Sequence, residues 1–354
     1  MLRLTDIGKS FGTSRAVTGA SLDVAEGELV CLLGPSGCGK STLLRMIAGL
    51  TDADTGMIAI AGHDVTALPA NRRPTAMVFQ SHALWNHMTV ERNVSFGLRV
   101  QGLPRAEVAR RVADVLELVG LSRFARRRPA ELSGGQAQRV ALARCLVVEP
   151  KVLLMDEPFS ALDADLRANL RAELKALQRR LKLTVIFVTH DQEEAMELAD
   201  RIVVMNSGRI EQIGRPNELY LEPRSLTVAR FIGQMNICDT TITGGRADWF
   251  GAALVTQCEA GPATILCRPE DLRPAAGGAP ARVDRVTDLG ATLRLYLTTD
   301  DGGQLVWLCT RAMAPTPGNH VRLLPGRCQV YRNGDRIGTA DATPPNAART
   351  RTSA

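Results

Sequence analysis

Residues 34–42 have the types and spacing of a phosphate-binding loop, G-x-x-x-x-G-K-[ST]. The loop directly follows an apolar run at residues 29–33, so we predict a strand that enters it and a helix that leaves it. Such a turn points several backbone N–H groups and the positive end of a helix at one place, which suits a polyphosphate. Lys40 would reach the β- and γ-phosphates, and the Ser41 hydroxyl would hold a Mg2+ ion. The predicted nucleotide contacts are Gly34, Pro35, Ser36, Gly37, Cys38, Gly39, Lys40, Ser41 and Thr42.

Three further apolar runs each end at polar residues that could take part in nucleotide hydrolysis. They are residues 75–79 before Gln80, residues 152–155 before Asp156 and Glu157, and residues 184–189 before His190. In open parallel sheets, ligands bind at the carboxyl ends of the strands. We therefore expect these side chains to meet at the phosphate loop.

Hydrolysis of ATP requires a metal ion, an oriented water and a group that senses the γ-phosphate. Asp156 is placed to hold Mg2+ with Ser41, directly or through water. Glu157 would act as general base or polarise the attacking water. Gln80 offers an amide oxygen to Mg2+ or to that water, and His190 offers a ring N–H to the γ-phosphate. A lone glutamine or histidine after a strand is more often structural, so the prediction rests on the set.

The composition is that of an ordinary globular protein, with 45% apolar and 4% aromatic residues. A length of 354 residues is enough for two domains with separate cores. The net charge of +6 belongs to an arginine-rich but mixed surface, so we expect no nucleic-acid partner. No apolar stretch approaches the ~18 residues of a membrane helix. If the protein works at a membrane, other chains must span it.

The order of predicted elements divides the chain. Residues 1–235 alternate apolar runs with helical patterns, which predicts a mixed α/β domain with a parallel core sheet. Runs at 2–7, 20–24 and 57–61 predict a flanking antiparallel β layer, and residues 89–148 predict a helical subdomain. Short alternating runs at 236–338 predict a small all-β, OB-like barrel. Residues 339–354 contain few large apolar side chains, and we predict a disordered tail.

Residues 132–136 read Leu-Ser-Gly-Gly-Gln before a helix predicted at 137–148. A serine in this position is typical of an N-cap, and the exposed N–H groups that follow could bind a second phosphate. On physical grounds alone, a helix start with a flexible turn remains the alternative.

The order of these motifs resembles the ATP-binding cassette of ABC transporters. The matching segments are the phosphate loop, Gln80, residues 132–136, Val-Leu-Leu-Met-Asp-Glu-Pro at 152–158, Ser-Ala-Leu-Asp at 160–163 and Thr-His-Asp at 189–191. The fold that the resemblance implies is a P-loop NTPase of the ABC type.

The resemblance also implies a head-to-tail dimer of two copies of the chain. Each copy would close over the ATP bound to the other, with Asp163 linking the two sites. The closing residues would be Ser133, Gly134, Gly135 and Gln136. Phe11 matches the aromatic residue that stacks on adenine in this family. A buried core phenylalanine is the alternative.

Several segments are similar to cassettes of importers for spermidine/putrescine, iron(III), sulfate and sugars. They lie at residues 77–90, 188–195, 200–205 and 231–233, and residues 267–272 resemble the TOBE barrel that these cassettes carry. The resemblance implies an ATPase on the cytoplasmic face of the inner membrane, bound to two transmembrane permease subunits and served by a substrate-binding protein.

Residues 173–178 and 208–212 look most similar to the polyamine branch, so spermidine/putrescine is our first substrate hypothesis. Iron(III), sugar, sulfate and phosphonate systems stay open, because other chains select the substrate. A soluble ABC ATPase or a non-hydrolysing regulatory module are further alternatives. His82, Trp85 and Asn86 replace the Tyr, Phe and Pro usual in import cassettes. Trp85 could anchor a permease subunit, with core packing as the alternative.

Overall fold

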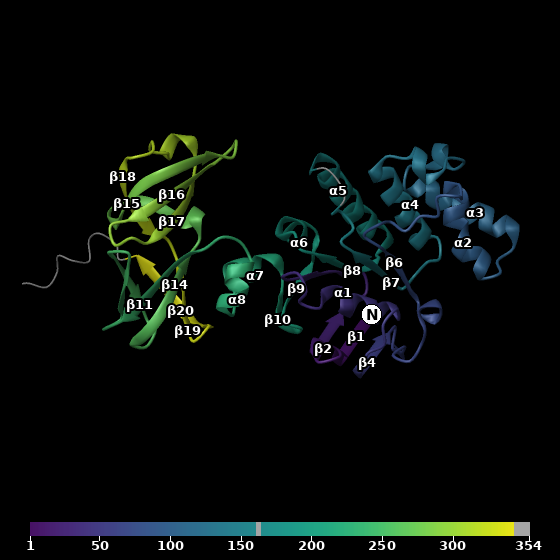
Figure 1. Cartoon of the computed structure of the whole chain (residues 1–354), viewed down its shortest axis with the longest axis horizontal. Helices are drawn as coiled ribbons and strands as arrows, with labels where there is room; N and C mark the ends of the chain where they lie inside the picture. The colour runs from purple at the N-terminus through teal and green to yellow at the C-terminus, as the bar shows by residue number, and fades with distance from the viewer. Residues whose placement is uncertain (161–163, 343–354) are drawn as a thin grey trace, which may run out of the picture. The chain divides into compact units, whose positions relative to one another are not determined.

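A computed structural model of the chain describes residues 1–160 and 164–342. The chain divides into two compact units, with the boundary between Asn217 and Glu218. The first unit is built on a six-stranded sheet in the order β10-β9-β3-β8-β7-β6 (Figure 1). The strands are β3 (Leu29–Leu33), β6 (Thr75–Val78), β7 (Val152–Asp156), β8 (Thr184–Thr189), β9 (Arg201–Asn206) and β10 (Arg209–Gly214).

All neighbouring strands of this sheet run parallel except β10, which is antiparallel to β9. Every residue of β3, β7 and β8 is buried, as expected for parallel strands covered on both faces. The unit also contains the helices α1 (Lys40–Ala48), α5 (Ala164–Leu181) and α6 (Gln192–Leu198). The strands β3, β8, β7 and β6 are neighbours in that order, so their carboxyl ends share one edge.

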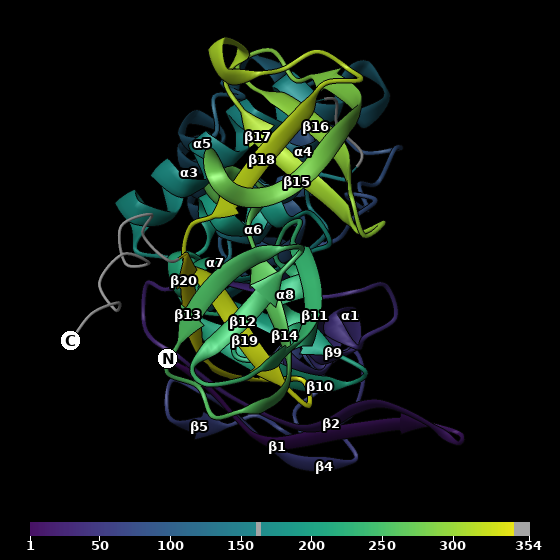
Figure 2. The same ribbon diagram turned by 90° about the vertical axis from the view of Figure 1, so that its left-hand side faces the viewer.

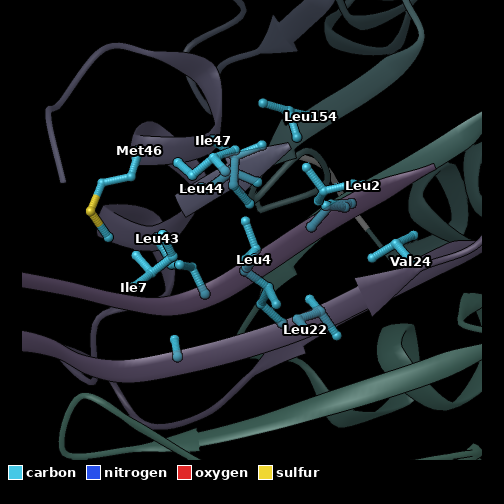
Figure 3. Close-up of a cluster of buried hydrophobic side chains, with 14 of the residues drawn as sticks. Leu2, Leu4, Ile7, Leu22, Val24, Leu43, Leu44, Met46, Ile47 and Leu154 are labelled. Carbon is cyan, nitrogen blue, oxygen red and sulfur yellow. The ribbon is translucent and has the colours of Figure 1, made fainter. Parts of the chain in front are cut away.

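The predicted antiparallel layer is present as a second sheet in the order β2-β1-β4-β5. Its strands are β1 (Leu2–Phe11), β2 (Ser14–Val24), β4 (Thr55–Ile60) and β5 (His63–Asp64). Buried residues of β1 and β2 share one core with α1, which includes Leu4, Leu22, Leu43 and Ile47 (Figure 3). The core fixes α1, and therefore the loop before it, against both sheets.

The helical subdomain contains α2 (Val90–Val100), α3 (Arg105–Leu118) and α4 (Gly134–Leu146). The start predicted for α4, at residue 137, is wrong because Gly134 and Gly135 are already helical. Ser133 is the N-cap, and a capping box places the glycines inside the first turn. Short 3-10 helices complete the fold: η1 (Ala70–Arg72), η2 (Ser122–Phe124), η3 (Pro129–Glu131), η4 (Pro269–Asp271) and η5 (Arg311–Met313). Within the described residues, no helix is long and apolar enough to cross a bilayer.

The second unit contains two antiparallel sheets that share one core (Figure 2). The first has the order β11-β14-β19-β20-β13-β12 and the second the order β17-β16-β15-β18. The first comprises β11 (Asn236–Ile242), β12 (Arg246–Trp249), β13 (Ala252–Thr256), β14 (Gly261–Cys267), β19 (Cys328–Arg332) and β20 (Asp335–Ala342). The second comprises β15 (Leu272–Asp288), β16 (Leu293–Thr299), β17 (Gln304–Cys309) and β18 (His320–Pro325). This barrel-like arrangement agrees with the predicted all-β fold.

The unit boundary lies earlier than the sequence division at 235/236. Two short helices, α7 (Pro216–Leu221) and α8 (Leu226–Phe231), precede β11. The segment around them bonds to the β-strands that follow: the Tyr331 hydroxyl donates to the Pro223 carbonyl at 2.8 Å, and the Leu226 N–H donates to the Gly334 carbonyl at 2.7 Å. These contacts assign the segment to the second unit.

The predicted tail is wrong at its start. Residues 339–342 belong to β20, which pairs with both β13 and β19. Ala340 is fully buried. The sequence did not predict this strand, because its side chains are small and it lacks the large apolar residues that usually mark a strand. The rest of the predicted tail, residues 343–354, lies outside the described residues.

Asn236 joins the two sheets of the second unit. It is 2% exposed, and its side chain accepts from the Val306 N–H at 2.7 Å and donates to the Val306 carbonyl at 2.9 Å. Asn236→Ala should lower the free energy of unfolding by about 2 kcal/mol, because two partly buried backbone groups of Val306 lose their partner. Denaturant unfolding followed by the fluorescence of the buried Trp249 and Trp307 measures this loss. The exposed Asn319→Ala is the control, and an equal loss in both variants would contradict the assignment.

Candidate active site

At two positions of the phosphate loop that follows β3, only glycine fits the available space. A Cβ atom on Gly34 would lie 2.2 Å from the Met205 carbonyl oxygen. Gly39 has φ +100, and a Cβ there would lie 2.2 Å from the Ala16 carbonyl oxygen. These two glycines let β9 and β2 approach the loop closely. The loop conformation is thus fixed by its neighbours on both sides.

Lys40, the first residue of α1, lies inside this loop. Its side chain is directed toward the loop backbone, where Nζ donates to the Gly34 carbonyl at 2.7 Å and the Pro35 carbonyl at 2.9 Å. Only 6% of the residue is exposed. The ammonium is therefore held where the loop would receive phosphate groups.

Ser41 and Asp156 form a contact between α1 and the end of β7. The Ser41 hydroxyl donates to Asp156 Oδ1 at 2.8 Å, and Arg45 Nη2 lies 3.9 Å from Asp156 Oδ2. Asp156 is 7% exposed. A hydroxyl and a carboxylate side by side are hard oxygen donors, the ligand type that Mg2+ prefers.

The next residue, Glu157, contacts side chains that follow two other strands of the sheet. Gln80 Nε2 donates to Glu157 Oε2 at 3.2 Å, and His190 Nδ1 lies 3.4 Å from Glu157 Oε1. The Glu157 backbone has φ +44, which is uncommon outside glycine. Its N–H donates to the Val188 carbonyl at 3.0 Å, so the conformation is anchored to β8. Residues that follow β6, β7 and β8 therefore meet at one carboxylate.

Two residues that line the same small pocket as Glu157 were not given a role from the sequence. The Ser160 hydroxyl accepts from Gln80 Nε2 at 3.1 Å and donates to the Glu157 carbonyl at 3.1 Å. Glu194, 3% exposed, accepts from the Thr189 hydroxyl at 2.7 Å, and burial raises the pKa of its carboxyl group. Asp191 caps the start of α6, accepting from the Glu193 N–H at 2.8 Å. The Asp191-x-x-Glu194 spacing, typical of a capping box, could have predicted a helix start at this position in the sequence.

Phe11 lies at the end of β1 and is 55% exposed, which excludes the alternative of a buried core residue. It pairs with Ser14 at the start of β2, just before the Ala16 carbonyl that touches Gly39. An exposed aromatic ring is thereby carried on the hairpin that borders the loop.

The residues predicted to act on a second copy lie apart from the loop. Ser133 and Gly134 are exposed at the start of α4. Ser133 and Gln136 bond to each other, and among the hydrogen bonds of the described residues none joins 133–136 to 34–42. Gly135 is buried, and a Cβ there would lie 3.0 Å from the Leu166 side chain. Asp163 lies outside the described residues.

A phosphate loop between β3 and α1, with an acidic pair at the end of β7, defines a P-loop nucleotide-binding protein. The family model described as ABC transporter matches residues 17–160, and the model described as TOBE domain matches residues 265–330.

Curated relatives extend this match over most of the chain. The sulfate/thiosulfate import ATP-binding protein CysA of Burkholderia mallei is 47% identical over 93% of this chain and 99% of its own length. The spermidine/putrescine import ATP-binding protein PotA of Photobacterium profundum is 49% identical over 77% of this chain and 76% of its own. The chain belongs to the ATP-binding subunits of ABC importers, and it is an ATP-binding ATPase.

Solved structures agree with the fold of the first unit. The dimeric structure of the ATP-binding cassette MJ0796 bound to ADP and Pi has a TM-score of 0.54 and 32% identity, covering 61% of this chain and 99% of that one. The cbiO1 protein of Clostridium perfringens, described as part of the cbiONQ complex, has a TM-score of 0.57 and 30% identity, covering 62% of this chain and 90% of that one.

Gly39→Ala should lower ATP affinity at least about hundredfold, because the new methyl group would overlap the Ala16 carbonyl and φ +100 disfavours alanine. Gly37→Ala is the matched comparison. It has φ +77 but no atom within 4 Å of the added Cβ, so only backbone strain applies, and we expect about a tenfold loss. Titration with a fluorescent ATP analogue measures both. Equal affinities in the two variants would refute the steric argument.

Proposed function

We propose that the chain hydrolyses ATP as a head-to-tail homodimer at the cytoplasmic face of the membrane and powers import through two permease subunits supplied by a substrate-binding protein. The observation that carries this proposal is the Glu157 carboxylate, which lies within 3.4 Å of Gln80 and His190 and directly follows Asp156, the partner of Ser41. Relatives named as import proteins match this chain over most of their own length. This match disfavours a soluble ABC ATPase.

Each of these residues has a role in the proposed chemistry. Lys40 would exchange the loop carbonyls for the β- and γ-phosphates, and the N–H groups of residues 34–42 would bind the remaining phosphate oxygens. Ser41, Asp156 and the amide oxygen of Gln80 would hold Mg2+, which supplies charge neutralisation on the phosphates. Phe11 would stack on adenine.

Glu157 would act on the water that attacks the γ-phosphate. A carboxylate can accept a proton or orient the water, and Gln80 and His190 fix its direction from two sides. His190 is exposed, so its ring can leave the carboxylate and donate to the γ-phosphate. The site thus contains a water-activating group and a phosphate sensor that contact each other.

The exposed residues support a dimer. Ser133 and Gly134 present the first turn of α4 to solvent, and the N–H groups at the start of a helix suit the γ-phosphate of a second copy. The MJ0796 cassette, which this unit resembles, is dimeric with ADP and Pi bound. We propose that Gly135, Gln136 and Asp163 complete the same contact.

Glu157→Gln should lower kcat for ATP hydrolysis at least about a thousandfold, because an amide cannot accept the proton. Since ATP binding is preserved, the variant should accumulate as an ATP-dependent dimer, visible by size-exclusion chromatography. The exposed Glu26→Gln serves as the control and should hydrolyse ATP like the wild type. Normal turnover in Glu157→Gln would contradict the assignment, and an inactive wild type, with or without permease subunits, would favour a non-hydrolysing regulatory module.

Trp85 contributes to a surface that suits a permease subunit. It is half-buried and packs on Phe96 with 4.5 Å between ring centroids, while Phe96 remains 40% exposed and Val100 73% exposed. Trp85 is thus neither a core residue nor a free side chain. Phe96 and Val100, four residues apart on α2, extend this exposed apolar surface.

Trp85→Ala should keep ATP binding but reduce transport-coupled ATP hydrolysis by about tenfold or more, as expected when an aromatic anchor is lost from an interface. Trp85→Phe, which keeps an aromatic contact, should retain most of the coupling. The measurement compares substrate-stimulated ATPase activity of the reconstituted transporter with ATP affinity of the free chain. Unchanged transport in a fully assembled Trp85→Ala complex would rule out this docking role.

For the substrate, we propose a polyamine as the first candidate, from the resemblance at residues 173–178 and 208–212. The relatives include proteins named for sulfate and for spermidine/putrescine at similar identity, 47% and 49%, so they support importer function without choosing between the two. Uptake of labelled putrescine and labelled sulfate by vesicles that contain the complete transporter separates a dication from a dianion. Uptake of sulfate alone would replace the polyamine hypothesis.

A further inference from the structure

The backbone that follows Gln80 has a shape that its own sequence does not favour. His82 has φ +59 and Ala83 has φ +47, and neither residue is glycine. L-residues rarely occupy this left-handed region without support from their surroundings. Some contact outside the segment must therefore hold these two residues.

Arg144, in the last turn of α4, supplies that contact. Its Nη2 donates to the His82 carbonyl at 2.9 Å, and its Nη1 donates to the Ala83 carbonyl at 2.6 Å. The planar guanidinium thus binds two consecutive carbonyls at the left-handed residues. A lysine would offer one nitrogen on a flexible stem, whereas the arginine holds two nitrogens in one rigid plane, one for each carbonyl.

The Arg144 guanidinium interacts with His82, Ala83 and Trp85 of this segment. Among the described residues no carboxylate lies within ion-pair distance of Arg144, and its guanidinium carbon lies 5.1 Å from the centroid of the Trp85 ring. Burial lowers the pKa of Arg144. A half-buried cation without an anionic partner depends on the carbonyl oxygens and on the aromatic ring for its stabilisation.

A second helix holds the same segment from the other side. Asn93 of α2 is fully buried, accepts from the Trp85 N–H at 2.9 Å and donates to the Trp85 carbonyl at 3.1 Å. The segment from Gln80 to Trp85 is therefore bonded to both α2 and α4. Gln80, which bonds to Glu157, is at one end of the segment, and Trp85 is at the other.

We propose that Arg144 is a positioning residue that makes the occupancy of the ATP site and the position of α4 depend on each other. Residues 134–146 form one helix about 20 Å long. Ser133 caps its first turn and Arg144 lies in its last, so a displacement of the capped end is carried to His82 and Ala83. This displacement changes how Gln80 meets Glu157. The inference rests on the proposed ATPase function and adds a residue that touches neither nucleotide nor metal.

The test uses three variants of the full chain. Arg144→Lys should lower kcat about tenfold while KM for ATP changes less than twofold, because the phosphate loop and Phe11 are untouched. Adding Ala83→Gly should recover at least threefold of that loss, since glycine adopts φ +47 without the guanidinium fork. Arg139→Lys is the matched control, because Arg139 lies on the same helix but pairs with Glu173 at 2.6 Å; it should keep wild-type kcat.

A purely structural role predicts a different pattern. Loss of stability alone would lower kcat and melting temperature together, and Ala83→Gly would not restore activity. That result, or wild-type kcat in Arg144→Lys, overturns the proposal.

A second readout is independent of hydrolysis. ATP binding should change the emission of Trp85 in the wild type and in Arg139→Lys, but not in Arg144→Lys; the other tryptophans, Trp249 and Trp307, are buried in the second unit. If the wild type binds ATP without turnover, the proposed function fails while this emission change still supports Arg144. If ATP leaves Trp85 emission unchanged in the wild type, the Arg144 proposal fails while ATP hydrolysis stands.

Discussion

Burial of the central strands on both faces of the sheet is the constraint on which the site depends. Every residue of β3, β7 and β8 is buried, so these strands cannot shift or turn without exposing apolar surface. Their carboxyl ends are fixed at one edge, and the first polar residue after each strand has one direction in which to leave the core. The proximity of Ser41, Asp156, Glu157 and His190 follows from this arrangement.

The strained positions at the site also follow strands of this sheet. Glu157 follows a buried strand at φ +44, and His82 and Ala83 follow β6 closely at positive φ. A chain that leaves a rigid sheet edge must turn within a few residues, and neighbouring groups compensate for the local cost. At Glu157 the compensation comes from the backbone of β8, whereas at His82 and Ala83 it comes from a side chain of α4.

The sequence predicted the parts of the site that depend on motifs and on strand ends. Lys40 and Ser41 belong to the phosphate-loop pattern, whereas Gln80, Asp156 and His190 follow apolar runs, and parallel strands bring such positions together. The start of α4 was missed because two glycines in a row favour a turn unless a serine and a glutamine cap the helix around them. The Arg144 contact was beyond prediction, since nothing local distinguishes this arginine from Arg139, and the chain brings it to His82 only through tertiary packing.

The position of β20 has a consequence for how the protein is made. This strand, residues 335–342, lies between β19 and β13 inside its sheet. The first unit has all its strands once Gly214 has been synthesised, so it can fold on the ribosome while the remaining chain is still being made. The second unit cannot close its sheet until residue 342 emerges. During translation, the nucleotide site can therefore form well before the barrel-like unit that follows it.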